Sequence, residues 1–271
     1  MLNETYTLSN GVKIPKLGLG TWFIDDDKAG DTVKEAVKLG YRLIDTAQAY
    51  GNERGVGEGV RNCGLPRNEI FVTTKLWNDD VRSGNTREAL KKSLENLGLD
   101  YVDLYLIHWP AEGYVEAYLE MEKLQKEGLT RSIGVSNFRK SHLQNLLSKV
   151  HIVPSINQIE TNPQMVDEET IQYCKENKIG VEAWSPLGSG ACLNNPKIQE
   201  IANKYQKSSA QIILRWLLQK GIVILPKSVH ENRIKENIDL FNFVLENEDV
   251  ELINQLNQHK RTGPDPDNFD F

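Results

Sequence analysis

The sequence predicts an α/β protein, a (β/α)₈ TIM barrel with an N-terminal β-hairpin and extra C-terminal helices. Short apolar runs recur along the 271 residues, and segments with the apolar spacing of helices separate them. Strands that alternate with helices pair in parallel through crossover connections, and eight such units in about 250 residues are typical of one closed barrel. The eight predicted strands are residues 17–20, 41–46, 70–75, 101–108, 132–136, 155–160, 180–185 and 222–227.

Both ends of the chain add elements to the predicted barrel. Residues 6–14 alternate in polarity around Asn10-Gly11, a dipeptide that favours a tight hairpin turn because both residues accept positive φ. Past the eighth strand, residues 231–240 and 249–257 carry a helical pattern and precede a tail rich in proline and aspartate. We expect a single domain over residues 1–271, since no linker interrupts the pattern.

The segment Thr86–Leu97 illustrates the helices expected between the strands. Its leucines fall on one face and its charged residues on the other. Asn85 or Thr86 is suited to cap its start, and Gly98 is suited to end it because glycine accepts the left-handed conformation.

A doubly wound open sheet is the alternative α/β fold. Such sheets bind dinucleotides through a G-x-G-x-x-G turn after the first strand. Gly18 with Gly20, and again Gly55 with Gly57, begin this pattern, but the third glycine is absent in both places. The incomplete fingerprint favours the barrel.

Composition limits the function classes. The formal net charge of −6 and the isoelectric point near 5.5 argue against a general affinity for nucleic acid, although they allow a small cationic pocket. No apolar run reaches the roughly 18 residues of a membrane span, and the first residues do not resemble a signal peptide. We therefore expect a cytoplasmic protein without a membrane partner. The three cysteines are widely spaced and form no C-x-x-C pair, which indicates reduced thiols rather than disulfides or a zinc site.

Polar residues gather at the ends of seven predicted strands. The active site of a barrel of this kind lies at the carboxyl ends of its strands, so these positions are informative. Any one of them alone is compatible with a turn or a satisfied polar group, but seven in register favour an active site. From the second strand to the eighth they are Asp45 with Tyr50, Lys75, His108, Ser136-Asn137, Gln158 with Glu160, Trp184-Ser185 and Lys227-Ser228.

Four of these residues suit the protonation of an alkoxide as it forms. The phenol of Tyr50 has an ordinary pKa of about 10, and the ammonium group of Lys75 is expected to lower it by stabilising the phenolate. Asp45 would keep Lys75 charged in a site removed from water. His108 would donate a hydrogen bond to a carbonyl oxygen and orient the substrate, or share the proton with Tyr50. No metal ion is required by this chemistry.

Seven motifs occur in order along nearly the whole chain. They are GYRLIDTAQAYGNERGVG (40–57), TTKLW (73–77), DLYLIHWP (103–110), GVSNF (134–138), NQIE (157–160), WSPLG (184–188) and LPKSV with RIKEN (225–237). Together they resemble the aldo-keto reductases, and most closely the bacterial diketo-gluconate reductase and glyoxal (methylglyoxal) reductase branch of that family. The resemblance implies that Tyr50 is the general acid and that Asp45 and Lys75 lower its pKa. It also implies that His108 orients the carbonyl and that the protein is a monomer by default.

The same resemblance implies a cofactor, because these side chains cannot themselves transfer two electrons. The family binds nicotinamide dinucleotides in extended form without a glycine-rich turn. Ser136, Asn137 and Gln158 match the residues that hold the nicotinamide carboxamide. Trp184 matches the aromatic residue that stacks on the nicotinamide ring, where many members carry tyrosine.

NADPH is expected in preference to NADH. Lys227, Ser228 and Arg233 match the family's contacts with the adenosine 2′-phosphate, and a phosphate monoester prefers paired cations, a hydroxyl and a helix N-terminus. Glu236 and Asn237 are expected near the adenine. The other expected cofactor contacts are Thr21, Trp22, Ser185, Leu187 and Val229.

The expected substrate pocket is apolar and flat-sided. Trp22, Trp77 and Trp109 follow the first, third and fourth strands and match positions that wall the active site in relatives, beside Tyr50 and His108. The connection after the fourth strand and the C-terminal tail are short, which suggests an open mouth. Small aldehydes, methylglyoxal-like dicarbonyls and keto sugars are the expected substrates of this NADPH-dependent carbonyl reductase.

A different class of function stays open. Some relatives bind NADPH chiefly for regulation, so a regulatory or sensor subunit with little turnover is the alternative. The presence of the four catalytic residues, with no added interaction domain, counts against it.

Other enzyme classes fit the sequence less well. A metal-dependent hydrolase would need H-E-x-x-H, but His230-Glu231 is not followed by a second histidine. Short-chain dehydrogenases use Tyr-x-x-x-Lys, whereas Arg54 stands four residues after Tyr50. A serine hydrolase would need G-x-S-x-G, which neither Ser136 nor Ser189 satisfies.

Overall fold

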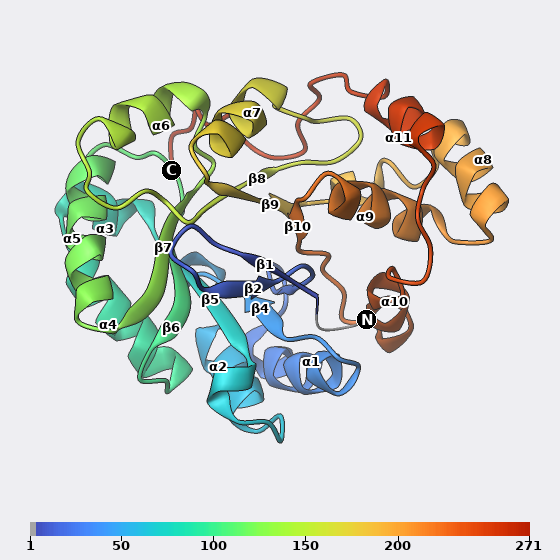
Figure 1. Cartoon of the computed structure of the whole chain (residues 1–271). Coiled ribbons are helices and arrows are strands. Elements are labelled where there is room, and N and C mark those ends of the chain that lie inside the picture. Colours follow the sequence, from blue (N-terminus) through green and yellow to red (C-terminus); the bar gives the residue numbers. More distant parts are fainter. Residues whose placement is uncertain (1–3) are drawn as a thin grey trace.

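The computed structural model describes residues 4–271 and contains a small and a large sheet (Figure 1). The small sheet is the antiparallel pair β1 (Thr5–Thr7) and β2 (Lys13–Pro15). The large sheet has eight parallel strands that pair in chain order. They are β3 (Leu19–Gly20), β4 (Leu43–Asp45), β5 (Phe71–Leu76), β6 (Val102–Ile107), β7 (Thr130–Ser136), β8 (Ile156–Glu160), β9 (Gly180–Trp184) and β10 (Val223–Ile224).

The large sheet closes on itself. Leu17, just before β3, forms a parallel bridge with Ile224 of β10. Two backbone hydrogen bonds support it, from the Gly18 N–H to the Ile224 carbonyl (2.9 Å) and from the Ile224 N–H to the Lys16 carbonyl (3.1 Å). Every predicted strand is present and the edges of the sheet meet, so the predicted TIM barrel is confirmed.

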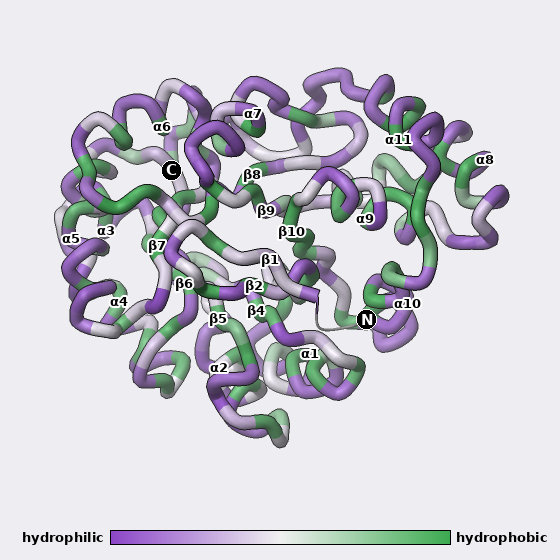
Figure 2. The backbone as a smooth tube through the Cα atoms, viewed as in Figure 1, coloured by the Kyte–Doolittle hydropathy of each residue, from purple (hydrophilic) through white to green (hydrophobic). Residues whose placement is uncertain are grey.

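Helices follow the strands and surround the barrel, as Figure 1 shows. In Figure 2 these helices carry both hydrophobic and hydrophilic stretches, as expected for helices with one face on a core. Their bounds are α1 (Asp26–Lys38), α2 (Glu53–Arg61), α3 (Asn78–Ser83), α4 (Thr86–Leu97), α5 (Tyr114–Lys126), α6 (Lys140–Leu147), α7 (Glu168–Glu176), α8 (Pro196–Tyr205), α9 (Ser209–Gln219), α10 (Glu231–Ile238) and α11 (Asn247–Asn254). The two extra C-terminal helices are therefore confirmed as α10 and α11, with slightly different ends.

Helix α4 has the predicted bounds. Gly98 ends it in the left-handed region at φ 62°. Asn85 stands at the N-cap, but its side chain makes no capping hydrogen bond and its Nδ2 donates to Ser83 Oγ (3.0 Å) instead. The capping hydrogen bond expected from the Asn85 side chain is therefore not formed.

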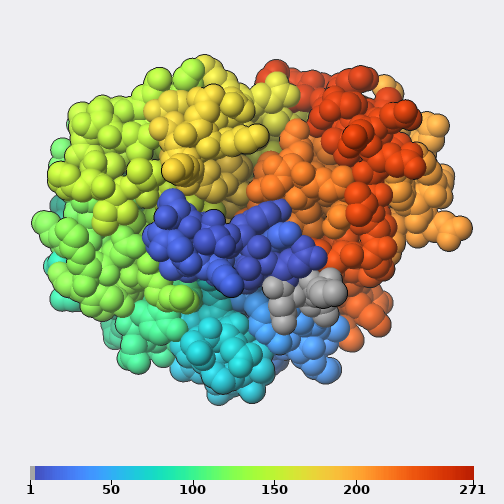
Figure 3. All heavy atoms as spheres, viewed as in Figure 1, coloured from blue at the N-terminus to red at the C-terminus, as the bar shows by residue number. Residues whose placement is uncertain are grey.

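The hairpin covers the amino-terminal end of the barrel. Leu8 and Ile14 pack in one buried cluster with Leu43, Phe71 and other side chains from inside the barrel. Figure 3 shows the N-terminal segment, in dark blue, lying across the middle of this face of the molecule. The hairpin therefore closes the amino-terminal end of the barrel. A binding site can open only at the carboxyl ends of the strands.

Alternation along each strand decides which side chains point inward. Leu104 and Leu106 of β6 belong to the cluster inside the barrel, whereas Tyr105 and Ile107 pack in the outer core beneath the helices. Side chains two apart on a strand share a face, so the next inward residue is His108. The inward positions thus change from apolar to polar toward the carboxyl ends of the strands.

Candidate active site

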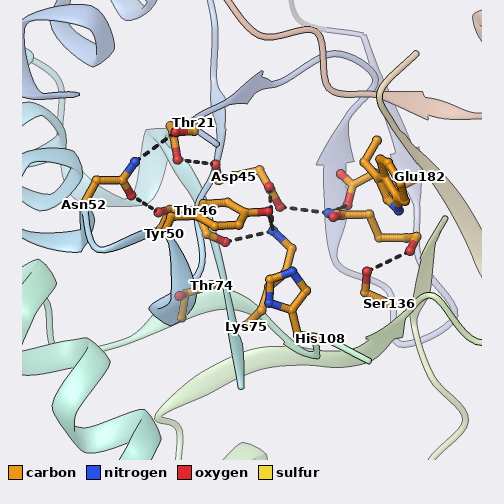
Figure 4. A network of polar contacts seen from close by, with 12 residues as sticks. Thr21, Asp45, Thr46, Tyr50, Asn52, Thr74, Lys75, His108, Ser136 and Glu182 are labelled. Atoms are coloured by element: carbon orange, nitrogen blue, oxygen red, sulfur yellow. Dashed lines mark hydrogen bonds and ion pairs between the residues drawn. The ribbon is translucent and has the colours of Figure 1, made fainter. Parts of the chain in front are cut away.

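A buried ammonium group lies at the centre of the polar network (Figure 4). Lys75 Nζ contacts Asp45 Oδ1 at 2.7 Å and donates to the Thr46 carbonyl (2.9 Å) and to Tyr50 Oη (3.2 Å). The side chain of Lys75 is 0% exposed and that of Asp45 is 4% exposed. The structure therefore brings three of the predicted catalytic residues into direct contact.

Tyr50 reaches this network from a short 3-10 turn, Gln48–Tyr50, that follows β4. Gly51 ends the turn at φ 67°. Asn52 then fixes the loop: it accepts from Thr46 Oγ1 (2.7 Å) and donates to the Thr21 carbonyl (2.9 Å). Lys75 Nζ lies 4.9 Å from the centre of the Tyr50 ring, so the cation faces both the ring and its hydroxyl.

The net pKa shift of Tyr50 is upward, although Lys75 acts on this pKa in the expected downward direction. Burial raises the pKa of the Tyr50 hydroxyl, and the nearby charge of Lys75 offsets this only in part. The sequence reveals the lysine but not the depth of the pocket. The phenol is consequently held protonated at neutral pH, which is the form a proton donor needs.

The charge of Lys75 is maintained by its neighbours. Burial alone would lower the pKa of Lys75, but attraction to Asp45 and Tyr50 raises it overall. Burial also raises the pKa of Asp45, against the opposing effect of its hydrogen bonds from Lys75 and Gln158. Both partners donate to Asp45, so the contacts favour its carboxylate form.

His108 lies beside Tyr50 and is neutral. The two ring centres are 5.7 Å apart at an interplanar angle of 72°. Burial lowers the pKa of His108 well below its usual range, and the charge of Lys75 adds to the effect. Its Nδ1 is buried without a hydrogen-bond partner among residues 4–271. A neutral imidazole at this position can donate or accept but adds no second positive charge.

The residues matched to the nicotinamide carboxamide also come together. Ser136 Oγ and the Asn137 N–H both donate to the Gln158 carbonyl (2.8 and 2.9 Å). Asn137 Nδ2 donates to the His108 carbonyl (3.0 Å), and Trp184 Nε1 donates to Asn137 Oδ1 (2.8 Å). Asn137 has a φ of 63°, an uncommon conformation that this network maintains.

The residues matched to the 2′-phosphate lie around the start of α10. Lys227 and Arg233 are exposed and form no salt bridge within residues 4–271. Ser228 is buried, and its Oγ accepts from the His230 N–H (3.0 Å) just before the helix. Two free cations and a hydroxyl therefore border one helix N-terminus.

The remaining predicted cofactor residues lie on several segments of the chain and differ in exposure. Val229 is 43% exposed and Asn237 is buried. The Glu236 carboxylate accepts from Ser208 Oγ at the start of α9. Leu187 and Ser185 are half-buried, and Ser185 has a φ of 48°. Thr21 is buried, and its hydroxyl donates to the Asp45 carbonyl (2.9 Å).

The C-terminal tail supplies aromatic residues that the sequence does not predict for the site. The Trp77 ring stacks on Phe271, with 5.7 Å between ring centres and 7° between planes, and it also meets the His108 ring edge-on at 5.2 Å. Trp109 is covered by Phe269 and Phe271, each at 5.3 Å. The expected open mouth is therefore partly walled by the tail.

The third predicted wall residue behaves differently. Trp22 is 51% exposed and packs on the adjacent Phe23 at 4.1 Å between ring centres. Phe23 is 75% exposed and has a φ of 57°. Trp22 thus lies outside the cluster of aromatic rings around Trp77.

Two buried carboxyl groups of the barrel have roles that sequence reasoning missed. Glu160 accepts from the Thr262 N–H and Oγ1, both at 2.6 Å, and so fastens the tail. Glu182 of β9 is 0% exposed and accepts from Gln158 Nε2 (2.7 Å). The sequence feature that could have identified Glu182 is its position as an acidic residue between Val181 and Ala183 in an apolar strand. It also stands two positions before Trp184 and so shares a strand face with it.

Glu182 is expected to make stability fall as the pH rises. Burial raises the pKa of its carboxyl to about 8, with repulsion from Asp45 adding to the effect. The folded state therefore binds the proton more tightly than the unfolded state, where the pKa is about 4.3. The stability that Glu182 adds through this proton is fully present below about pH 4.3 and is lost as the pH rises toward 8. Glu182→Gln does not titrate, so its unfolding free energy relative to the unaltered protein should increase by a few kcal/mol between pH 5 and about 8. A difference that stays constant across chemical denaturation curves at these pH values would contradict this.

Two further structural findings bear on function. Within residues 4–271, no three His, Cys, Asp or Glu side chains gather in a way that could hold a metal ion. No helix in this part of the chain combines the length and apolarity needed to cross a bilayer.

Comparisons with known proteins agree with this geometry. Residues 16–258 match the sequence model of the aldo/keto reductase family. The chain is 48% identical over 272 residues to glyoxal reductase of Bacillus subtilis, covering 100% of this chain and 99% of the relative. It is 46% identical over 275 residues to methylglyoxal reductase DkgA of Escherichia coli, covering 99% of each. Among solved structures, the aldo-keto reductase AKR2E4 of Bombyx mori in complex with NADP superimposes with a TM-score of 0.91 at 39% identity, over 98% of this chain and 96% of that one. The chain therefore belongs to the aldo/keto reductase family of NADP-dependent oxidoreductases.

Proposed function

We propose that this chain is an NADPH-dependent carbonyl reductase in which Tyr50 is the general acid. The observation that carries the proposal is the position of Lys75 Nζ, which lies 2.7 Å from Asp45 Oδ1 and 3.2 Å from Tyr50 Oη. A phenol next to a fixed ammonium group can release its proton because the phenolate that remains is stabilised at once.

The residues present fit a nicotinamide dinucleotide. Gln158 uses both amide hydrogens within the protein, so its side-chain oxygen remains to accept from a carboxamide. Lys227 and Arg233 have no salt-bridge partner within the described chain, which leaves them available for a 2′-phosphate. When bound, NADPH supplies the hydride to the carbonyl carbon.

Tyr50 moves one proton in this reaction. Its O–H bond breaks as the carbonyl oxygen takes the proton, and the phenolate then accepts the hydrogen bond from Lys75 Nζ. Asp45 holds Lys75 in place and charged throughout. The high pKa of the buried Tyr50 keeps its proton until the alkoxide forms.

His108 orients the substrate. Its Nδ1 is buried and has no hydrogen-bond partner in residues 4–271, so Nδ1 cannot be reached by a substrate. Nε2 is therefore the ring nitrogen available to a carbonyl oxygen. The neutral ring can donate there from Nε2 and so direct the oxygen toward Tyr50.

The proposed substrates are small aldehydes, dicarbonyls and keto sugars. Trp77 and Phe271 form a flat wall next to His108, which suits a compact carbonyl compound. Relatives named glyoxal reductase and methylglyoxal reductase support the choice of dicarbonyls.

Tyr50→Phe tests the role of the acid. We expect kcat to fall by about 10² to 10⁴, the usual contribution of general acid catalysis, while NADPH still binds. NADPH and NADH oxidation would be followed with methylglyoxal, small aldehydes and keto sugars, and NADPH binding by calorimetry. Tyr173→Phe on α7 is the matched control and should leave both quantities unchanged, since Tyr173 lies outside the site.

Retained turnover in Tyr50→Phe would refute the assignment of the acid. NADPH binding without oxidation by the unaltered protein across the whole panel would instead favour a regulatory subunit.

A further inference from the structure

Glu182 is a buried carboxyl group that the proposed reaction does not use. It lies on β9, two residues before Trp184, and therefore points into the barrel on the same face. Its Oε2 accepts from Gln158 Nε2, while its Oε1 has no hydrogen-bond partner among residues 4–271. Figure 4 shows Glu182 on the opposite side of Asp45 from Tyr50. Within the described chain, its one side-chain hydrogen bond is thus with a residue of the expected cofactor site.

Gln158 has a single tenable amide orientation in this environment. Its Nε2 donates one hydrogen to Asp45 Oδ2 (2.8 Å) and the other to Glu182 Oε2 (2.7 Å). The opposite orientation would place the amide oxygen against Asp45 Oδ2, so that two acceptors would face each other with no hydrogen between them. Asp45 alone would restrain one hydrogen, and Glu182 restrains the second.

The backbone of Gln158 is held equally firmly. Its carbonyl accepts from Ser136 Oγ (2.8 Å) and from the Asn137 N–H (2.9 Å). Trp184, on the same strand as Glu182, donates to Asn137 Oδ1 (2.8 Å). The side-chain oxygen of Gln158 is therefore the one polar atom of this residue left without a partner within the described chain.

We propose that Glu182 is a positioning residue for the nicotinamide: it takes the second amide hydrogen of Gln158 and thereby turns the amide oxygen of Gln158 toward the cofactor. The inference rests on the proposed function, because it assigns that oxygen to the carboxamide. The raised pKa of Glu182 is consistent with the role, since a neutral acid accepts through its carbonyl oxygen without adding a second negative charge beside Asp45.

The test measures the dissociation constant of NADPH by calorimetry, without turnover. Glu182→Met keeps the length of the side chain but removes the oxygen acceptors, and Glu182→Asp withdraws the acceptor by one methylene. Each should weaken NADPH binding by about tenfold, the usual effect of one lost orienting hydrogen bond. Glu182→Gln keeps an acceptor of the same reach and should stay within about twofold of the unaltered protein. Thermal unfolding would establish that each variant is folded.

A double-mutant cycle separates positioning from a general structural role. If Glu182 acts through Gln158, then Glu182→Met should have little further effect in a Gln158→Met background, where the double variant should bind NADPH within about twofold of Gln158→Met alone. Effects that multiply would overturn the proposal, as would unchanged affinity in folded Glu182→Asp and Glu182→Met. These outcomes are distinct from failure of the proposed function, which would appear as absent NADPH binding in the unaltered protein or retained turnover in Tyr50→Phe.

Discussion

Replacing Lys75 with methionine is expected to reduce both turnover and stability by large amounts. The substitution leaves the Asp45 carboxyl group buried without its cation, which typically costs 3–5 kcal/mol, about the effect of breaking a buried ion pair. It also removes the ammonium group 3.2 Å from Tyr50 Oη, so the phenolate loses its stabilising partner. We expect kcat to fall by at least about 10² to 10⁴. Denaturant unfolding and NADPH oxidation with methylglyoxal would measure the two effects.

Two variants separate the contributions of Lys75. Lys91→Met removes a lysine from the exposed face of α4 and should change the unfolding free energy by no more than about 0.5 kcal/mol. Adding Asp45→Asn to Lys75→Met removes the unpaired charge and should restore part of the stability but none of the activity. Stability that does not recover in the double variant would mean that the loss comes from packing rather than from charge.

Replacing Gly57 with alanine is expected to lower the unfolding free energy by about 3 kcal/mol, although alanine favours helices over glycine by about 1 kcal/mol. A Cβ at this position of α2 would overlap the backbone carbonyl oxygen of Leu97 at the end of α4. A backbone group at a helix end cannot rotate away as a flexible side chain can. For a chain of this size the midpoint of thermal unfolding should fall by roughly 6 °C or more.

Glu58→Ala is the control for the Gly57 variant. Glu58 is the next residue of α2, is exposed and already carries a Cβ. Its replacement should alter the unfolding free energy by no more than about 0.5 kcal/mol. A neutral or stabilising Gly57→Ala would show that α2 and α4 can separate without cost.

Gly55 and Gly57 also illustrate what a sequence pattern can and cannot say. The sequence excludes them from a nucleotide-binding turn by the missing third glycine. It does not reveal that they allow α2 to approach Asp26 and Leu97 closely, because the partners of a helix face are set by tertiary packing. The same spacing of glycines can therefore serve either a nucleotide-binding turn or the close packing of helices.

The inward polar residues could be predicted because two regularities act together. Side chains alternate along a strand, and the carboxyl ends of all barrel strands meet at one mouth. Asp45, Lys75 and Gln158 follow apolar strands, and the structure places them within one hydrogen-bonded network. Neither regularity depends on distances between strands, so the sequence alone was sufficient to predict which polar residues meet at the mouth.

The net pKa shift of Tyr50 and the aromatic wall from the tail could not be predicted. The first depends on how much water is excluded around Tyr50, which is a property of the whole pocket. The second depends on where the last residues fold back: Asn78 and Arg82 both donate to the Phe271 carbonyl (3.0 and 2.7 Å). Contacts across almost two hundred residues leave no local pattern in the sequence.

The bridge between Leu17 and Ile224 links the order of folding to the assembly of the binding site. The two strands beside this seam have only two residues each, and they lie at opposite ends of the barrel sequence. Joining distant segments requires a large loss of chain entropy, so we expect the seam to form late. Gly20 donates across it to the Pro226 carbonyl (3.2 Å), which brings the chain before Thr21 to the segment that carries Lys227. A dinucleotide that contacts the chain on both sides of the seam would bind only the closed barrel. Its binding would therefore slow the opening of the seam and would indicate that the barrel has closed.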